Sequence, residues 1–366
     1  MNAQRLGTIV RLELMQRTRS VAWYVLLGVF ASLLLLVTGL SFLAFRWAGD
    51  ANGAAIYSTI VYITLLLVVL VSPTLSGNSI NGDRDAATLA PVQVTLATTL
   101  EIILGKFLAA WITGLAFVVV AVPFLAIATL AGQADVATIV VSLLVLIVEV
   151  AVIAAIGVAL SGILARPLFS VATTYLVVAA LVVGTVIAFG LIGATMRTEQ
   201  TVSSRSIDWS QYGDDEFPCM PGEEPSEEYP CVDDVTPECG EWETYTTETV
   251  RFDAVWWILA ANPFVILADA TPSSFDSNGY PVDMFGQIKS GVRSAQQPPP
   301  SEVVYDECSP SFTDDQRTPE EVVEESTPSW FVGLGLQILL AAGLLWWAWA
   351  RTNTPARKLP PGTRIA

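Results

Sequence analysis

One acidic residue, Glu149, lies in the middle of a long apolar segment and is the clearest candidate for chemistry in this sequence. A charged side chain at the centre of a membrane-spanning helix costs roughly 2.5–3.5 kcal/mol on insertion scales, so a carboxyl group kept there should face protein or water. Such a group could contact a cationic ligand or relay a proton. The alternative is a structural carboxyl group that hydrogen-bonds to a Thr or Ser of a neighbouring helix.

Several kinds of catalysis are excluded by composition. The chain contains no histidine, which removes Ser-His-Asp and Cys-His catalysis, HExxH metalloproteases and His-ligated zinc or copper. The phosphate-loop motif GxxxxGK[ST] is also absent, so we expect no ATP site of that type in this chain. A net charge of −17 argues against a nucleic-acid partner. We therefore predict no catalytic residues, no cofactor and no metal site of the chain's own.

All four cysteines, Cys219, Cys231, Cys239 and Cys308, fall within residues 196–329. An even number confined to one segment predicts two disulfides formed in an oxidising space. Four cysteines allow three connectivities, and the sequence does not choose among them. Free thiols or a bound metal are the alternative, which the lack of CxxC spacing and of histidine disfavours.

These residues must be positioned by long apolar elements. Hydrophobic residues make up 53% of the 366 residues, charged residues only 14%, and the mean hydropathy is +0.55. A membrane-spanning helix needs about 20 mostly apolar residues. Six segments qualify, which predicts an all-α polytopic membrane protein: 21–45, 56–75, 107–131, 137–164, 168–194 and 330–350. A seventh segment, 254–270, is short and interrupted by Asn262-Pro263, which predicts an interfacial or re-entrant piece.

The basic residues predict an orientation. Outside residues 196–329 there are 12 Lys and Arg residues, and with a cytoplasmic N-terminus all of these except Arg46 face the cytoplasm. We therefore expect a protein of the cell (plasma) membrane. The positive-inside rule places both of its termini in the cytoplasm and residues 196–329 outside the cell. Residues 351–366 form a basic cytoplasmic tail. Residues 1–20 mix apolar side chains with arginines, which indicates an amphipathic helix at the inner interface or a plain positively charged anchor.

The predicted outer segment, 196–329, has a different composition from the rest. It carries 28 acidic and 6 basic residues, a net charge of −22. Its last part, 295–329, is rich in Pro, Glu, Asp and Ser and is expected to be flexible. The acidity could attract cations or cationic ligands, but a solvated surface is the favoured interpretation.

The cytoplasmic segment 76–106 has a Gly-rich polar turn, a semi-apolar stretch and a charged return into the membrane. Its pattern Asp83-Arg84-x-x-Ala87-Thr88-Leu89, followed by Glu101-Ile102 and Gly105-Lys106, resembles the Glu-Arg-x-x-Gly-Thr-Leu and Glu-Ile-x-x-Gly-Lys signature of type-2 ATP-binding-cassette (ABC) exporter permeases. The six spans and Ala261-Asn262-Pro263-Phe264 before the last span are also similar to that family. The large acidic outer segment is a departure, so no substrate is carried over.

The resemblance implies a function and partners. Residues 1–20 would be an elbow helix, and 76–106 would hold a coupling helix that docks on a separate ABC ATPase subunit, which binds ATP and Mg. A second permease subunit, identical or paralogous, would complete the transporter among the membrane lipids. The residues implied in coupling are Asp83, Arg84, Thr88, Leu89, Glu101 and Lys106, and Glu149 becomes a candidate for the translocation path. The exported substrate would be lipid-like, a peptide or drug-like.

Two other classes of function are weighed against this one. A membrane-anchored sensor or surface-assembly protein would act through the disulfide-bearing outer segment, but six spans are more than an anchor requires. An intramembrane enzyme would need histidine or two intramembrane aspartates, and the sequence offers neither.

Overall fold

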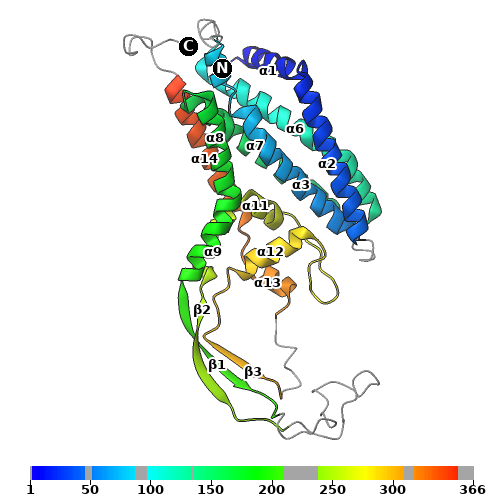
Figure 1. The fold of residues 1–366 in the computed structure, drawn as a ribbon, viewed down its shortest axis with the longest axis vertical. Coiled ribbons are helices and arrows are strands. Elements are labelled where there is room, and N and C mark those ends of the chain that lie inside the picture. The colour runs from blue at the N-terminus through cyan, green and yellow to red at the C-terminus, as the bar shows by residue number, and fades with distance from the viewer. Residues whose placement is uncertain are drawn as a thin grey trace.

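The computed structural model describes residues 2–45, 52–86, 97–132, 135–208, 238–308 and 317–352. The molecule is elongated, with a helical bundle at one end and a small sheet at the other (Figure 1). Helix α1 and the last turn of α14 lie at what we call the terminal end of the bundle. Helices α11 to α13 and the sheet lie at the opposite end, called here the sheet end.

Six helices are long and apolar enough to cross a membrane, as the sequence predicts. They are α2 (Val21–Phe45), α3 (Asn52–Ser76), α6 (Thr99–Ala131), α7 (Val136–Ile163), the continuous run α8 (Pro167–Ala179), η2 (Ala180–Gly184) and α9 (Thr185–Thr195), and α14 (Trp330–Thr352). Helix α6 begins earlier than the expected 107. A capping box between Thr98 and Glu101 starts the helix there, so its first turns are polar and escape a hydropathy criterion.

Helix α1 (Ala3–Thr18) begins with Asn2, whose side chain accepts a hydrogen bond from the Gln4 amide. The helix packs on the first turns of α6, where Gly105 allows a close approach. A Cβ at Gly105 would lie only 2.6 Å from Ile9 Cγ2. The absence of a side chain at this position therefore lets α1 lie against α6.

The segment between the fifth and sixth spans re-enters the bundle. It comprises η4 (Phe252–Ala254), α10 (Trp257–Ala260) and α11 (Pro263–Ala270). Pro263 occupies the first helical position of α11 and Asn262 caps it, so the chain reverses between α10 and α11. Ile266 and Leu267 are fully buried. The segment 254–270 thus folds back onto the bundle, and η4, α10 and α11 are called here the re-entrant segment.

The chain is mostly helical, as expected, and it also contains a small sheet. The sheet has the order β2-β1-β3 and consists of β1 (Arg197–Arg205), β2 (Glu243–Val250) and β3 (Glu302–Asp306). Strand β1 is antiparallel to β2 and parallel to β3. The range 295–329, expected to be flexible, contains β3 and α13 (Pro319–Glu325). Strands β1 and β2 are polar and carry no apolar alternation, so the sequence pattern does not reveal them.

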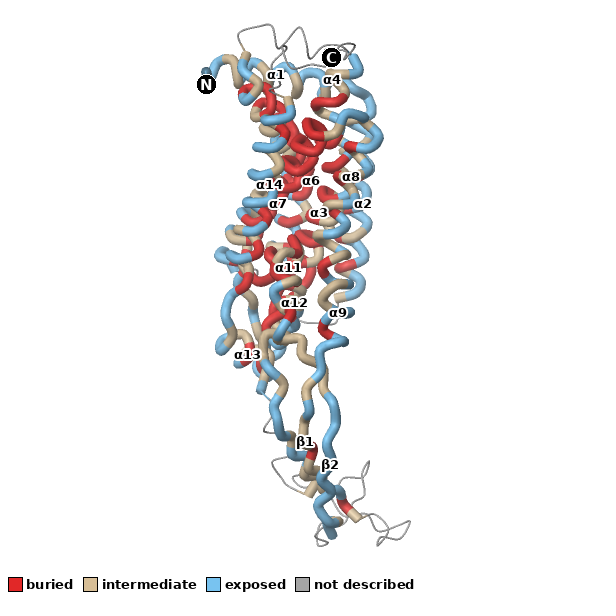
Figure 2. The backbone as a smooth tube through the Cα atoms, turned by 90° about the vertical axis from the view of Figure 1, so that its left-hand side faces the viewer, coloured by how far each residue is buried: buried red, intermediate tan, exposed pale blue. Residues whose placement is uncertain are grey.

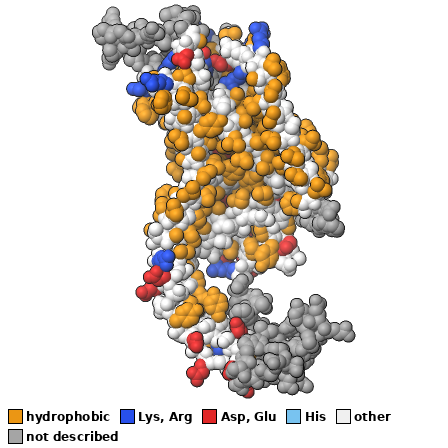
Figure 3. All heavy atoms as spheres, viewed as in Figure 1, with side chains coloured by type: hydrophobic (Ala, Val, Ile, Leu, Met, Phe, Trp, Pro, Cys, Tyr) orange, Lys and Arg blue, Asp and Glu red, His pale blue; other side chains and the backbone are white. Residues whose placement is uncertain are grey.

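The buried residues concentrate inside the bundle, whereas the sheet is mostly exposed (Figure 2). The largest buried cluster joins α2, α3, α6 and α7 with α11 and with α12 (Met284–Ser294). Its centre includes Tyr57, Phe117 and Phe285, which are at most 1% exposed. Hydrophobic side chains cover the flank of the bundle, and charged side chains gather toward its two ends (Figure 3).

Candidate functional site

The predicted coupling residues meet at the terminal end around Lys106. Its ammonium group lies 2.5 Å from Glu13 Oε1 of α1 and 2.6 Å from Asp83 Oδ2 of α4 (Asn81–Asp85). The Lys106 side chain is only 3% exposed. The Glu13 and Asp83 side chains are 18% and 33% exposed, so the cation is buried while its carboxylate partners reach the surface. The cluster joins α1, α4 and α6.

Glu101 supports the same junction. Its carboxylate accepts hydrogen bonds from the backbone amides of Asn2, at 2.6 Å, and Thr98, at 2.9 Å. It therefore joins the start of α1 to the start of α6. Because Glu101 and Lys106 are both buried, they position this end of the chain and present no surface of their own.

Arg84 fastens α4 to the end of α7. Its guanidinium donates to the carbonyl oxygens of Gly162 and Leu164, at 3.1 and 3.2 Å. Carbonyl groups at a helix C-terminus lack helical partners and favour a cation. Ser161 Oγ accepts from the amides of Ile80 and Asn81, which fixes the other side of α4.

Four of the six predicted coupling residues are thus brought together, namely Asp83, Arg84, Glu101 and Lys106. Thr88 and Leu89 lie outside the residues that the structure describes. Sequence analysis missed Glu13 and Ser161. Glu13 is the only acidic residue in the first 20, a signal that could have suggested a partner for a buried cation.

Glu149 lies in α7 and is fully buried. Neither of its carboxylate oxygens has a hydrogen-bond partner among the described residues. The structure therefore does not show the hydrogen bond to a neighbouring Thr or Ser that the structural alternative requires. Gln337 of α14 is also buried, and its Oε1 has no partner in the same part of the chain.

Asn262 links the re-entrant segment to the fifth span. Its side-chain amide donates to Val182 O at 2.7 Å and to Thr185 Oγ1 at 2.9 Å, and its Oδ1 accepts from the Phe264 amide. Val182 lies in η2, a π-helical turn. Such turns shift the backbone hydrogen-bond pattern and are frequent at functional sites. One side chain thus caps α11 and bonds to the irregular turn.

A second buried ion pair closes the sheet end of the bundle. Arg293 Nε of α12 lies 2.6 Å from Asp269 Oδ1 of α11, and both side chains are at most 4% exposed. Nearby, burial lowers the pKa of Lys289 and raises the pKa of Asp283. Lys289 donates a hydrogen bond to the carbonyl of Thr271 at the end of α11. The polar side chains of α12 therefore hold α12 against α11.

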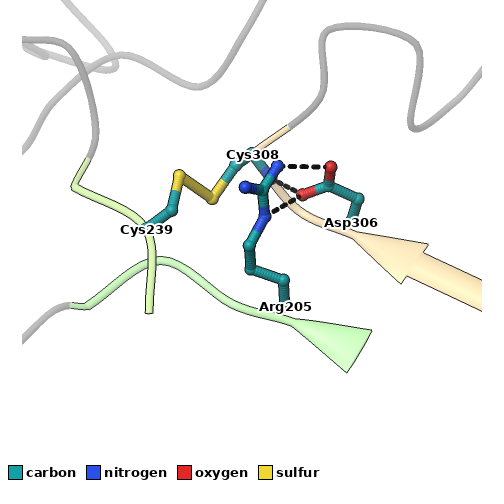
Figure 4. Close-up of a disulfide and its surroundings, with 4 residues drawn as sticks. All are labelled: Arg205, Cys239, Asp306 and Cys308. Atoms are coloured by element: carbon teal, nitrogen blue, oxygen red, sulfur yellow. Dashed lines mark hydrogen bonds and ion pairs between the residues drawn. A yellow bond between two sulfur atoms is a disulfide. The ribbon is translucent and has the colours of Figure 1, made fainter. Parts of the chain in front are cut away.

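The sheet is closed by a disulfide between Cys239 and Cys308, whose Cα atoms are 6.3 Å apart. Beside it, Arg205 forms a bidentate pair with Asp306 at 2.9 and 2.6 Å (Figure 4). The Arg205 guanidinium also stacks 4.8 Å from the ring centre of Trp242. One of the predicted cysteine pairs is therefore present, and Cys219 and Cys231 lie outside the described residues.

A scan against models of known protein families gives no match, and a search of curated protein sequences gives none either. The class of protein therefore rests on the fold itself. Six helices long and apolar enough to cross a membrane, joined to a disulfide-closed sheet, describe a multi-pass membrane protein.

Proposed function

We propose that this chain is the transmembrane permease subunit of an ABC exporter, in which a separate ATPase subunit hydrolyses ATP. The observation that carries the proposal is the set of ion pairs and hydrogen bonds that joins α1, α4, α6 and α7 at the terminal end. Asp83 and Arg84 of α4 bind directly to α6 and to the end of α7, and Lys106 extends the contact to α1. A push on α4 would therefore move α6, α7 and α1 together, as a coupling element requires.

The proposed orientation places the terminal end in the cytoplasm. The basic residues outside 196–329 favour it, and α1 carries Arg5, Arg11 and Arg17 at that end. Helix α1 then has the position of an elbow helix at the inner interface. The sheet lies on the opposite side of the membrane, an oxidising space in which the Cys239–Cys308 disulfide is stable.

A sensor or surface-assembly protein that acts through the sheet is the second candidate. The disulfide-closed sheet is the observation in its favour. Such a protein has no need of a buried ion network that ties an internal segment to three helices. The exporter proposal accounts for that network, and its substrate class remains lipid-like, peptide or drug-like.

Purification of the full chain from its own membranes, with mass spectrometry of the copurifying proteins, tests the proposal. We expect a stoichiometric ATPase with a phosphate-loop motif and either one permease species or two. Asp85 is exposed on α4, so Asp85→Lys should reduce ATPase recovery without changing membrane insertion. Glu199→Lys, an exposed reversal on β1, is the matched control. Recovery of the chain alone, even after mild crosslinking, would contradict the exporter function.

A further inference from the structure

Three buried acceptor oxygens of α7 and α14 have no donor among the described residues. They are both carboxylate oxygens of Glu149 and Oε1 of Gln337, and the described residues supply no hydrogen-bond partner to any of them. Buried polar atoms are nearly always paired, so orphaned ones call for a ligand, an ion or water. These oxygens belong to two helices, α7 and α14, that pack against each other.

The two residues lie at the same depth. Gly162 of α7 packs on Ala348 of α14, and both helices run from the sheet end to the terminal end. From that contact Glu149 lies about 20 Å and Gln337 about 17 Å toward the sheet end, at 1.5 Å per residue. The depth difference of about 3 Å is within the reach of the two side chains.

The face of α7 that carries Glu149 borders a buried cluster shared with α14 and the fifth span. Ile156 lies seven residues further along α7 and so shares the face of Glu149 to within about 20°. Ile156 belongs to a buried cluster that includes Ala341 of α14, and Leu181 of η2 packs against this cluster. The face of α7 that carries Glu149 therefore contributes to a buried cluster to which α14 and the π-helical turn also contribute.

The amide of Gln337 has a fixed orientation. Its Nε2 donates to the carbonyl of Ala261 at 2.9 Å, in the break between α10 and α11. A flipped amide would set its oxygen against that carbonyl, so Oε1 must be the free end. The next residue in the chain, Asn262, donates to Val182 O and Thr185 Oγ1. Polar groups of the fifth span therefore lie beside the break between α10 and α11.

We propose that Glu149 and Gln337 form a binding site for a monovalent cation within the membrane, at the break between α10 and α11. Carboxylate, amide and carbonyl oxygens are the ligands that hard cations prefer, and one carboxylate balances one positive charge. Transporters place cation sites at broken helices near mid-membrane for the same reason. The same oxygen atoms could bind either a proton or an alkali cation. Occupancy by a proton would let Glu149 donate to Gln337 Oε1.

The titratable groups on the helices that pack against α7 lie at other depths or are engaged elsewhere. They are Arg84 of α4, Arg351 of α14, Glu101 and Lys106 of α6, Tyr57 and Tyr62 of α3, Tyr175 of α8, and Asp269 of α11. Tyr62 is the nearest in depth, because Tyr57, five residues before it, hydrogen-bonds to Ser142 of α7. The Tyr62 hydroxyl donates to Phe264 O, and the Tyr175 hydroxyl donates to Leu70 O. Among these elements, Glu149 is therefore the acid whose titration would govern the site.

The inference deepens the proposed transport function, because a cation at this depth would be the transported ion or would accompany the substrate. Its test needs no ATPase. The full chain in lipid nanodiscs is treated with dicyclohexylcarbodiimide, which adds to carboxyl groups in apolar surroundings, and labelling of Glu149 is measured by mass spectrometry. Parallel samples contain NaCl, KCl or choline chloride at one ionic strength and over a range of pH. Asp283 serves as the internal control carboxyl group.

At a cation concentration about ten times its Kd, labelling of Glu149 should slow about tenfold relative to choline while labelling of Asp283 stays unchanged. Protection by sodium or potassium identifies an alkali cation, and a pH dependence that is equal in all three salts identifies a proton. Gln337→Leu should weaken the protection, whereas Gln287→Leu, an exposed change on α12, should not.

Labelling that is insensitive to both salt and pH would overturn the proposal, and so would full protection in Gln337→Leu. The salt and pH series on the unmodified chain decides the matter even if a variant fails to fold. A negative result here together with a copurifying ATPase would remove the cation site and leave the exporter function standing.

Discussion

Asp269, near the end of α11, caps the start of α14. Its Oδ2 lies 2.6 Å from the backbone nitrogen of Ser329 and 2.9 Å from that of Trp330. Its other oxygen pairs with Arg293. One buried carboxylate thus satisfies the free amides at the start of the last span and ties the re-entrant segment to α12.

Replacing Asp269 should therefore destabilise the sheet end of the bundle. Asp269→Asn leaves the Arg293 guanidinium buried without its counter-charge, so we expect a loss of about 3–5 kcal/mol in the free energy of unfolding. Thermal unfolding in detergent measures it. The control is Glu325→Gln, which breaks the exposed pair with Arg317 and should cost at most about 1 kcal/mol. Equal losses in the two variants would contradict the role of Asp269.

The Asn262 side chain should stabilise the contact between the re-entrant segment and the fifth span. Asn262→Ala removes the hydrogen bonds to Val182 O of the π-helical turn and to Thr185 Oγ1 directly after it, and also the cap of α11. Stability should therefore fall by about 1–3 kcal/mol. Hydrogen–deuterium exchange should rise in peptides covering 180–195 and 257–270. Asn278→Ala, in an exposed turn, should leave exchange in both regions unchanged. Unchanged exchange in the Asn262 variant would show that η2 does not depend on it.

Lys106 should hold α1 on the bundle. In Lys106→Met the carboxylates of Glu13 and Asp83 lose the cation that separates them, and they repel each other. We expect faster deuterium exchange of α1 amides and easier proteolysis after Arg11 and Arg17. Arg11→Met is the control because Arg11 is exposed on α1, and its exchange should match the unmodified chain. Protection of α1 in Lys106→Met would mean that apolar packing alone holds the helix.

Acid should weaken the sheet through Asp306. The hydrogen bonds from Arg205 hold the pKa of Asp306 below its usual value of 3.8. A lowered pKa in the folded state contributes stability above 3.8 that is lost as pH falls through the lowered pKa. Reduction of the Cys239–Cys308 disulfide by a phosphine should therefore accelerate in this acid range. Asp306→Asn should abolish that pH dependence, and an unchanged profile would assign the effect to other groups.

The sequence predicts the membrane-spanning part well because long apolar runs have few alternatives. The bounds of α2 agree with the expected segment, and the other five spans differ mainly at their ends. The sheet could not be predicted. Its parallel partners, such as Val202 and Val303, are about a hundred residues apart, and their pairing depends on tertiary contacts rather than on local pattern.

The candidate sites are partly visible in the sequence. Glu149 is conspicuous as the single charge within the expected spans, and the charged residues of 76–106 stand out by their motif. Gln337 also interrupts an apolar run and could have been noticed. The π-helical turn and its bond to Asn262 could not, because the residues of η2 are ordinary helix-forming residues whose irregularity depends on their neighbour.

The Cys239–Cys308 bridge joins residues 69 positions apart. The chain between them contains β2, α10, α11, α12 and β3, so the segment that re-enters the bundle belongs to a closed covalent ring. A single protease cut anywhere in that ring leaves one covalent molecule until a reductant is added. Both ends of the re-entrant segment are also tethered to the same point on the sheet, so it can tilt or slide only as a loop whose ends move together.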